Sequence, residues 1–139
     1  MAKSRSTMRQ GGTVDPKVAM QHAVLAVQRA WASEVPDFAE WGSSEVESEP
    51  LIIYDLNGER LFYDFNVRIG KQTVGVVRAS ANTMVGSPIV SLQLGPHQWS
   101  SDEVPQEAVA AVKRRDAHTD INDNTSFVCY CYPKIAVRV

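Results

Sequence analysis

The strongest constraint on the fold is a turn signal near the middle of the chain. The residues Asp55–Leu56–Asn57–Gly58 separate the apolar run Leu51–Tyr54 from the segment Leu61–Ile69, in which apolar side chains recur at every second position. Asn57 and Gly58 readily adopt the positive φ angles of a tight turn between antiparallel strands. The pattern therefore predicts a β-hairpin with one apolar row facing the core.

Three further strands are predicted after this hairpin. A second turn at Gly70–Lys71–Gln72 leads into a strand of small residues over 73–81, and another strand covers 88–94. The last strand is expected over 126–139, with a bulge or an edge position at Pro133. Because small side chains allow close approach, we expect the N-terminal helix to pack over the strand 73–81.

The N-terminal part of the chain has the pattern of an amphipathic helix. Asp15 is a suitable N-cap and Pro16 suits the first turn, while Pro36 disfavours helix at Val35. At about 100° per residue the apolar side chains form one stripe, which predicts the buried face. That stripe contains Met20, Ala23, Val24, Val27, Ala30 and Trp31.

The remaining segments complete the expected fold. The acidic segment 37–50 predicts a connector whose end, near Val46, pairs as an edge strand. A second helix is predicted to begin at Asp102 and to end in the basic residues 113–115. The predicted class is α+β, with an N-terminal helix packed on a curved antiparallel sheet of about five strands and a second helix before the last strand. Both helices are expected on one face of the sheet.

Length and composition limit the function classes. The 139 residues suit one domain, so we expect residues 1–13 to be a flexible arm and residues 14–139 a single α+β domain. A formal net charge of −2 argues against a dedicated nucleic-acid binder, and no apolar run is long enough to cross a membrane. No leader pattern is visible, which predicts a cytoplasmic protein, whereas removal of a leader would place it outside the cell.

Few residues are candidates for chemistry. Cys129 and Cys131 are expected on one face of a strand, where they could form half a metal site, supply a nucleophile or pack in the core. His97 is the histidine best placed to meet a thiol. Two thiols are only half of a usual zinc set, and no Gly-rich phosphate loop occurs. We therefore predict core packing, with no metal or cofactor site.

Aromatic side chains give a second signal, because tryptophan is enriched where partners bind. Trp41 lies in the acidic connector, Trp99 lies in the loop after the strand 88–94, and Phe62 and Tyr130 fall on polar strand faces. Either these side chains meet a partner, or the two tryptophans cover the ends of the core.

The run Tyr54–Phe65 followed by Gly75–Ala81 resembles the cystatin-like and PepSY-like modules found as propeptides or inhibitors of cysteine peptidases, including the streptopain propeptide type. The likeness covers about residues 50–95 and depends on the Tyr-Asp-x-Asn-Gly hairpin and a strand ending in Ser-Ala. The resemblance implies a helix packed across a curved antiparallel sheet, and a cysteine peptidase as partner. Arg78 and Ala79 stand where those modules have more apolar residues.

These observations predict a non-enzymatic protein-binding module, with peptidase inhibition as the form that the resemblance implies. The contact surface is expected at hairpin tips and loops, namely Asn57, Gly58, Gly70, Lys71, His97, Gln98 and Trp99. One alternative is a structural subunit that assembles with copies of itself through strand edges and the N-terminal arm. Another is a small enzyme that uses the concave face of the sheet around Cys129, Cys131 and His97.

Overall fold

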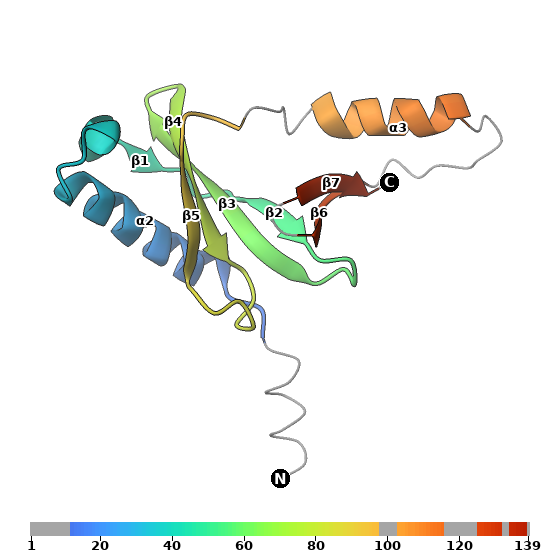
Figure 1. Ribbon diagram of the computed structural model, residues 1–139, viewed down its shortest axis with the longest axis horizontal. Helices are drawn as coiled ribbons and strands as arrows, with labels where there is room; N and C mark the ends of the chain where they lie inside the picture. Colours follow the sequence, from blue (N-terminus) through green and yellow to red (C-terminus); the bar gives the residue numbers. More distant parts are fainter. Residues whose placement is uncertain (1–11, 98–102, 116–124, 132–133, 139) are drawn as a thin grey trace, which may run out of the picture.

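The computed structural model describes residues 12–97, 103–115, 125–131 and 134–138, without the side chains of residues 113–115, 130, 131 and 134. Figure 1 shows an open sheet with α2 and α3 on different sides of it. In chain order the elements are α2 (Pro16–Ala32), the 3-10 helix η1 (Pro36–Ser43), β1 (Glu45–Val46), β2 (Leu51–Tyr54), β3 (Arg60–Ile69), β4 (Gln72–Ser80), β5 (Ile89–Leu94), α3 (Glu103–Arg115), β6 (Ser126–Cys131) and β7 (Lys134–Arg138).

The strands form one mixed sheet in the order β5-β4-β3-β2-β6-β7, with the short β1 pairing to β3. All described pairs are antiparallel except β2 and β6, which run parallel with Ile53 opposite Phe127. The α+β class is confirmed. The sheet differs from the expected one because it has seven strands, two of them in the segment predicted as a single last strand. The residues between β6 and β7, including Pro133, lie outside the described ranges.

The central hairpin forms where the sequence predicts it. The Asp55 carboxylate accepts hydrogen bonds from the backbone N–H groups of Asn57 and Glu59, both at 2.9 Å, and Gly58 has a φ of 84°. These hydrogen bonds pair backbone N–H groups of the turn with a side chain of the same turn. The strands β2 and β3 can therefore pair from Tyr54 and Arg60 onward.

A bulge sets the register of the next hairpin. The turn at Gly70 and Lys71 pairs Ile69 with Gln72 and Arg68 with Thr73. Val74 is then the extra residue, since Val67 pairs with Gly75 and the remaining pairs follow with the shifted register. As a result Asp64 lies directly opposite Arg78.

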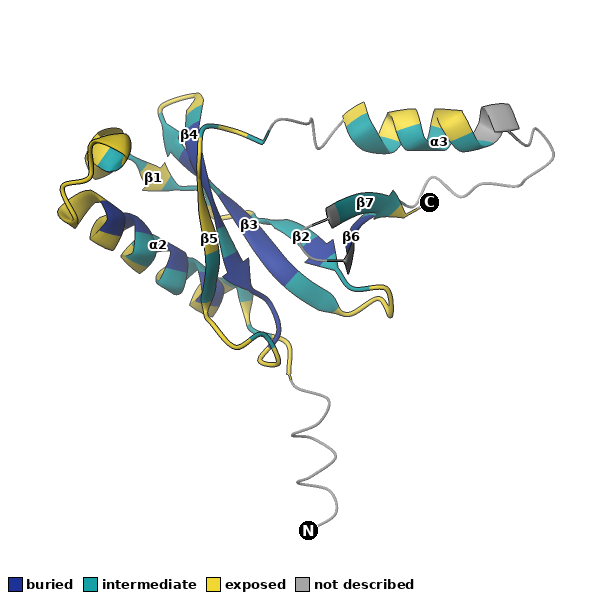
Figure 2. Cartoon of the chain, in the orientation of Figure 1, coloured by how far each residue is buried: buried dark blue, intermediate teal, exposed yellow. Residues whose placement is uncertain are grey.

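One core lies between α2 and the sheet. The Asp15 carboxylate accepts from the backbone N–H of Lys17 at 2.8 Å, which confirms the predicted cap. Figure 2 shows the buried residues of α2 on the side facing β3 and β4. The small strand β4 packs there as expected, and this cluster contains Ala19, Ala23, Val27, Ala30, Tyr63, Phe65, Val77 and Ala79.

Of the two tryptophans near this core, Trp31 departs from its prediction, and Trp41 follows the alternative in which it covers an end of the core. Trp31, predicted on the buried face, is 54% exposed, whereas Trp41 from the connector is buried. A Cβ atom added at Gly75 would lie within 2.4 Å of the Trp41 ring, so this ring fills the space over Gly75. Trp41 therefore closes the core at this end of the sheet, and the Trp31 ring lies outside it against Gly42.

A second core lies on the other face of the sheet. It contains Ile53, Phe62, Phe127 and Cys129, with Val104 of α3 packed against it. Ile52, the neighbour of Ile53, packs against the α2 core instead, as alternation along a strand requires. The expectation that both helices share one face is therefore wrong. α3 covers the face of the sheet opposite to the one covered by α2.

Candidate functional site

The most concentrated polar constellation is a buried carboxylate with two nitrogen partners. Asp64 on β3 has a completely buried side chain. Arg78 on β4 donates to both of its oxygens, from Nε to Oδ1 at 2.8 Å and from Nη2 to Oδ2 at 3.0 Å. His97, which follows β5, places Nε2 3.0 Å from Oδ2. The Arg78 guanidinium also lies over the Phe62 ring, at 5.3 Å from its centroid.

The electrostatics of this cluster favour an ionised carboxylate. Burial alone raises the pKa of Asp64, but the hydrogen bonds from Arg78 and His97 and the positive charge of Arg78 outweigh it. The pKa of Asp64 is therefore held below its ordinary value of 3.8. An ionised carboxylate can only accept hydrogen bonds, so the Nε2 atom of His97 carries a proton and donates it.

The cluster has an evident role in the topology. β5 is the outermost strand of the sheet beside β4, whereas α3 packs over the second core. His97 ties the segment that follows β5 to β3 through Asp64. Gly95 supports the same turn, since its N–H donates to the Val74 carbonyl at 2.9 Å. Asp64 thus holds the segment that directly follows β5 against the sheet.

The loop residues predicted as a contact surface are spread over the molecule. Asn57 and Gly58 precede β3, whereas Gly70 and Lys71 follow it, so the two turns lie at opposite ends of a ten-residue strand. The Gly95 turn joins the Gly70 end through Val74. His97 turns inward to Asp64, with its side chain only 14% exposed. Gln98 and Trp99 lie outside the described residues.

The residues of the predicted thiol site are found in two described environments. Cys129 on β6 is buried in the second core beside Ile53 and Phe127, while His97 is bound to Asp64 on β3. The side chains of Cys131 and Tyr130 are outside the description. Among the described residues, no three His, Cys, Asp or Glu side chains group as metal ligands.

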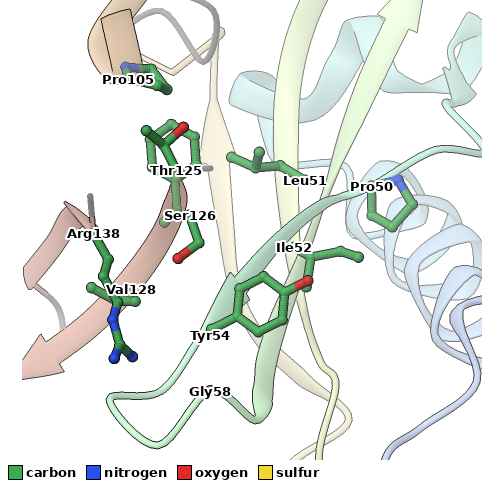
Figure 3. A pocket seen from close by; sticks show the side chains of 11 residues that line it. Pro50, Leu51, Ile52, Tyr54, Gly58, Pro105, Thr125, Ser126, Val128 and Arg138 are labelled. Atoms are coloured by element: carbon green, nitrogen blue, oxygen red, sulfur yellow. The ribbon is translucent and has the colours of Figure 1, made fainter. Parts of the chain in front are cut away.

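A groove of about 620 Å³ lies between β2 and β6 beneath the start of α3. Figure 3 shows Leu51, Ile52 and Tyr54 of β2 on one side of it and Thr125, Ser126 and Val128 on the other. Arg138 also lines it and donates to the Leu56 carbonyl at 3.1 Å. The described lining residues include no acid, histidine or cysteine, and the polar ones are Tyr54, Thr125, Ser126 and Arg138.

The exposed edge of the sheet at β5 is a further feature, and it was not predicted. On this strand Leu92 is 38% and Leu94 48% exposed. A groove of about 360 Å³ runs beside it, between β5 and α2. It is lined by His22, Leu25, Ala26, Arg29, Ala30, Pro88, Ile89 and Leu92. The sequence does contain a signal, because Ile89–Leu94 carries no charge, unlike most protected edges.

No family model, curated protein or solved structure matches this chain. None of the described helices is long and apolar enough to cross a membrane. The function must therefore be inferred from the surfaces themselves.

Proposed function

We propose that the chain is a protein-binding module that accepts an extended segment of its partner as an added strand on β5. β5 ends the strand order, and of the described strands only β4 pairs with it. An edge strand offers a row of backbone donors and acceptors, which natural proteins usually protect with charges, prolines or bulges. Beyond the register shift near its start, β5 has none of these protections over Ser91–Leu94. This open edge is the observation that carries the proposal.

The neighbouring groove indicates the chemistry of the partner segment. Strand addition draws affinity from main-chain hydrogen bonds and specificity from pockets that take alternate side chains. Leu25, Ile89 and Leu92 offer apolar contacts in the groove, and Arg29 and His22 lie along the α2 side. A suitable segment has apolar residues at alternate positions and an acidic residue that reaches Arg29.

The resemblance to peptidase propeptides gives the proposal its most specific form, in which the partner is a cysteine peptidase. The end of the sheet with Gly70, Lys71 and the Gly95 turn would approach the cleft, and the free edge of β5 ends there, with Leu94 opposite Gly75. The Gly95 to Val74 hydrogen bond, which holds these two turns together, supports a common contact surface. Asn57 and Gly58, at the far end of β3, would remain outside it.

Inhibition of a papain-like cysteine peptidase tests both the identity of the partner and the use of β5 as the contact. We expect inhibition by the full chain at micromolar concentration, and its loss in the double variant Leu92→Lys/Leu94→Lys, which adds charge to the edge. Asn57→Ala at the opposite turn is the matched control and should inhibit like the wild type. Absence of inhibition would exclude the peptidase form. Inhibition that survives the edge variant would show that β5 is not the contact.

Self-assembly is the second candidate, because the same open edge could pair with another copy. β7, the other end of the sheet, carries Lys134 and Arg138, whereas β5 is uncharged, so pairing of β5 with β5 in a twofold dimer is favoured. Light scattering over a concentration series distinguishes the candidates. A dimer that the Leu92→Lys/Leu94→Lys variant converts to a monomer would support assembly, and a strict monomer would exclude it.

A further inference from the structure

A second groove flanks α2 on the side away from β5. Its volume is about 770 Å³, and the residues that define it, called here the Trp31 groove, are Met20, Val24, Trp31, Trp41, Gly42 and Glu45. Trp31 is more than half exposed, although its indole is packed on Gly42, where an added Cβ would lie within 2.4 Å of Nε1. The ring is therefore a fixed aromatic platform with one side available. Aromatic rings held in this way bind apolar and cationic groups.

The segment that borders the Trp31 groove is acidic, although Glu47 within it is paired with Arg68. The segment 34–49, which runs through η1 and β1, carries six acidic side chains and no basic one. Glu45 of this segment lines the groove itself. The acidic residues also follow the C-terminus of α2, where the helix dipole is negative. The groove is thus suited to a segment that combines basic and apolar side chains.

Such a segment is present in the same chain. Residues 1–11 contain Lys3, Arg5 and Arg9, no acidic side chain, and the apolar Met8. Charge also selects between the two grooves of α2, because the groove beside β5 is lined by His22 and Arg29. A basic segment would be repelled there and attracted to the Trp31 groove.

The attachment point of this segment places the Trp31 groove within reach. Gly12 is fixed to Thr83, with its N–H donating to Thr83 Oγ1 at 2.7 Å. Figure 1 shows the chain entering α2 at the end of the helix far from β1. Eleven extended residues span up to about 36 Å, at about 3.3 Å each. The 17 residues of α2 rise about 26 Å. The segment can therefore follow the whole helix to Trp31.

We infer that residues 1–11 occupy the Trp31 groove of their own chain. Met8 is close enough to Gly12 to lie over the first turns, near Met20 and Val24. Lys3 and Arg5 then reach the acidic end, where a cation can lie over the Trp31 ring. This inference concerns a different surface from the β5 edge and does not depend on the proposed function.

The test compares amide and indole signals of the full chain by NMR with those of the variant Lys3→Glu/Arg5→Glu/Arg9→Glu. We expect the indole N–H signal of Trp31, assigned with Trp31→Phe, to move in this variant together with the amide signals of Gln28 and Glu45. Salt of about 1 M, where the Debye length is about 3 Å, should displace the same signals in the wild type. The control Lys71→Glu, at an exposed turn, should leave them in place.

Three outcomes would overturn the inference. The first is a Trp31 signal that is identical in the wild type and the charge-reversed variant, because the groove would then be empty. The second is an equal displacement in Lys71→Glu, which would indicate a general effect of charge. The third is a displacement that disappears on dilution, since the segment would then come from a second copy. The Leu92→Lys/Leu94→Lys variant should leave the Trp31 signal unchanged, which separates this result from the binding test at β5.

Discussion

Replacement of Arg78 by methionine provides the sharpest test of how much the buried Asp64 cluster stabilises the fold. The substitution keeps most of the length of the side chain but removes both hydrogen bonds to Asp64, at 2.8 and 3.0 Å. The carboxylate then stays buried with only the bond from His97 among its described partners. Breaking a buried ion pair in this way typically costs about 3–5 kcal/mol. Because His97 remains, we expect about 3 kcal/mol of lost unfolding free energy.

The matched control is Arg68→Met on the same face of the sheet. Arg68 meets Glu47 at 3.5 Å, and both side chains are about one third exposed, so this pair contributes at most about 1 kcal/mol. Urea denaturation at neutral pH measures both variants, and an unchanged slope would show that the denatured state is the same. If Arg78→Met costs no more than Arg68→Met, the interpretation of the Asp64 cluster is refuted.

A double variant separates a buried unpaired charge from a loss of packing. Asp64→Leu/Arg78→Met removes the charge as well as its partner, and apolar replacement of a buried pair is often close to neutral. We therefore expect it to be more stable than Arg78→Met alone. A double variant that is as unstable as the single one would show that the desolvated carboxylate is not the cause.

As the pH falls, the stability of the wild type and the stability of Arg78→Met are expected to change in opposite directions. In the wild type the pKa of Asp64 is below 3.8, so its contribution to stability is complete above that value. This contribution is lost as the pH falls through the lower pKa of the folded state. Without Arg78, burial is expected to dominate and to raise the pKa of Asp64. Arg78→Met should then recover stability relative to the wild type as the pH is lowered from neutral toward 4, which denaturation at several pH values measures.

The remaining predictions concern close contacts. Gly75→Ala forces a Cβ into the Trp41 ring and should cost about 1–3 kcal/mol in thermal unfolding, whereas Gly86→Ala, with no atom near its Cβ position, should stay within about 0.5 kcal/mol of the wild type. Equal effects would contradict the packing of Trp41 over Gly75. Tyr63→Phe removes the hydroxyl that donates to the Val14 carbonyl at 2.7 Å and should cost about 1 kcal/mol by chemical denaturation. A neutral result would mean that this bond does not fix the start of the chain.

Local signals explain the parts of the fold that the sequence predicts well. The central hairpin and the start of α2 depend on Asp55, Gly58, Asp15 and Pro16, each of which acts within a few residues of itself. The small side chains of β4 likewise predict a close neighbour, because their size is visible without a register. These features needed no information about distant parts of the chain.

The Asp64 cluster could not be predicted because its register depends on a bulge. Counting back from the turn at Gly70 and Lys71 without a bulge would place Asp64 opposite Val77, and Arg78 would point to the other face. The extra residue Val74 shifts the pairing by one position. Arg78 did give a weak signal in the sequence, since it is the one charged side chain of its strand. Only the three-dimensional register shows that the two meet.

Two other features, the choice of buried tryptophan and the parallel strand pair, depend on how distant segments of the chain pack together. Trp31 fits the apolar stripe of the helix, but η1 brings Trp41 onto Gly75 and leaves Trp31 outside. Similarly, the parallel pairing of β6 with β2 joins segments about seventy residues apart, which local patterns in the sequence do not reveal. Periodicity identifies the apolar face of a helix or strand, but it does not decide which of two aromatic side chains is buried in the core.

Two features of the fold remain accessible on the surface, namely the edge strand β5 and the exposed Trp31 ring. α2 separates two grooves, one beside β5 with Arg29 and His22 and one at Trp31 with Glu45. Because their charges are opposite, a segment that suits one groove is disfavoured in the other. An acidic partner segment on β5 and the basic residues 1–11 at Trp31 can therefore be bound at the same time, on the two sides of one helix. The unpaired edge and the exposed indole then have separate ligands, and a substitution that impairs one should leave the other intact.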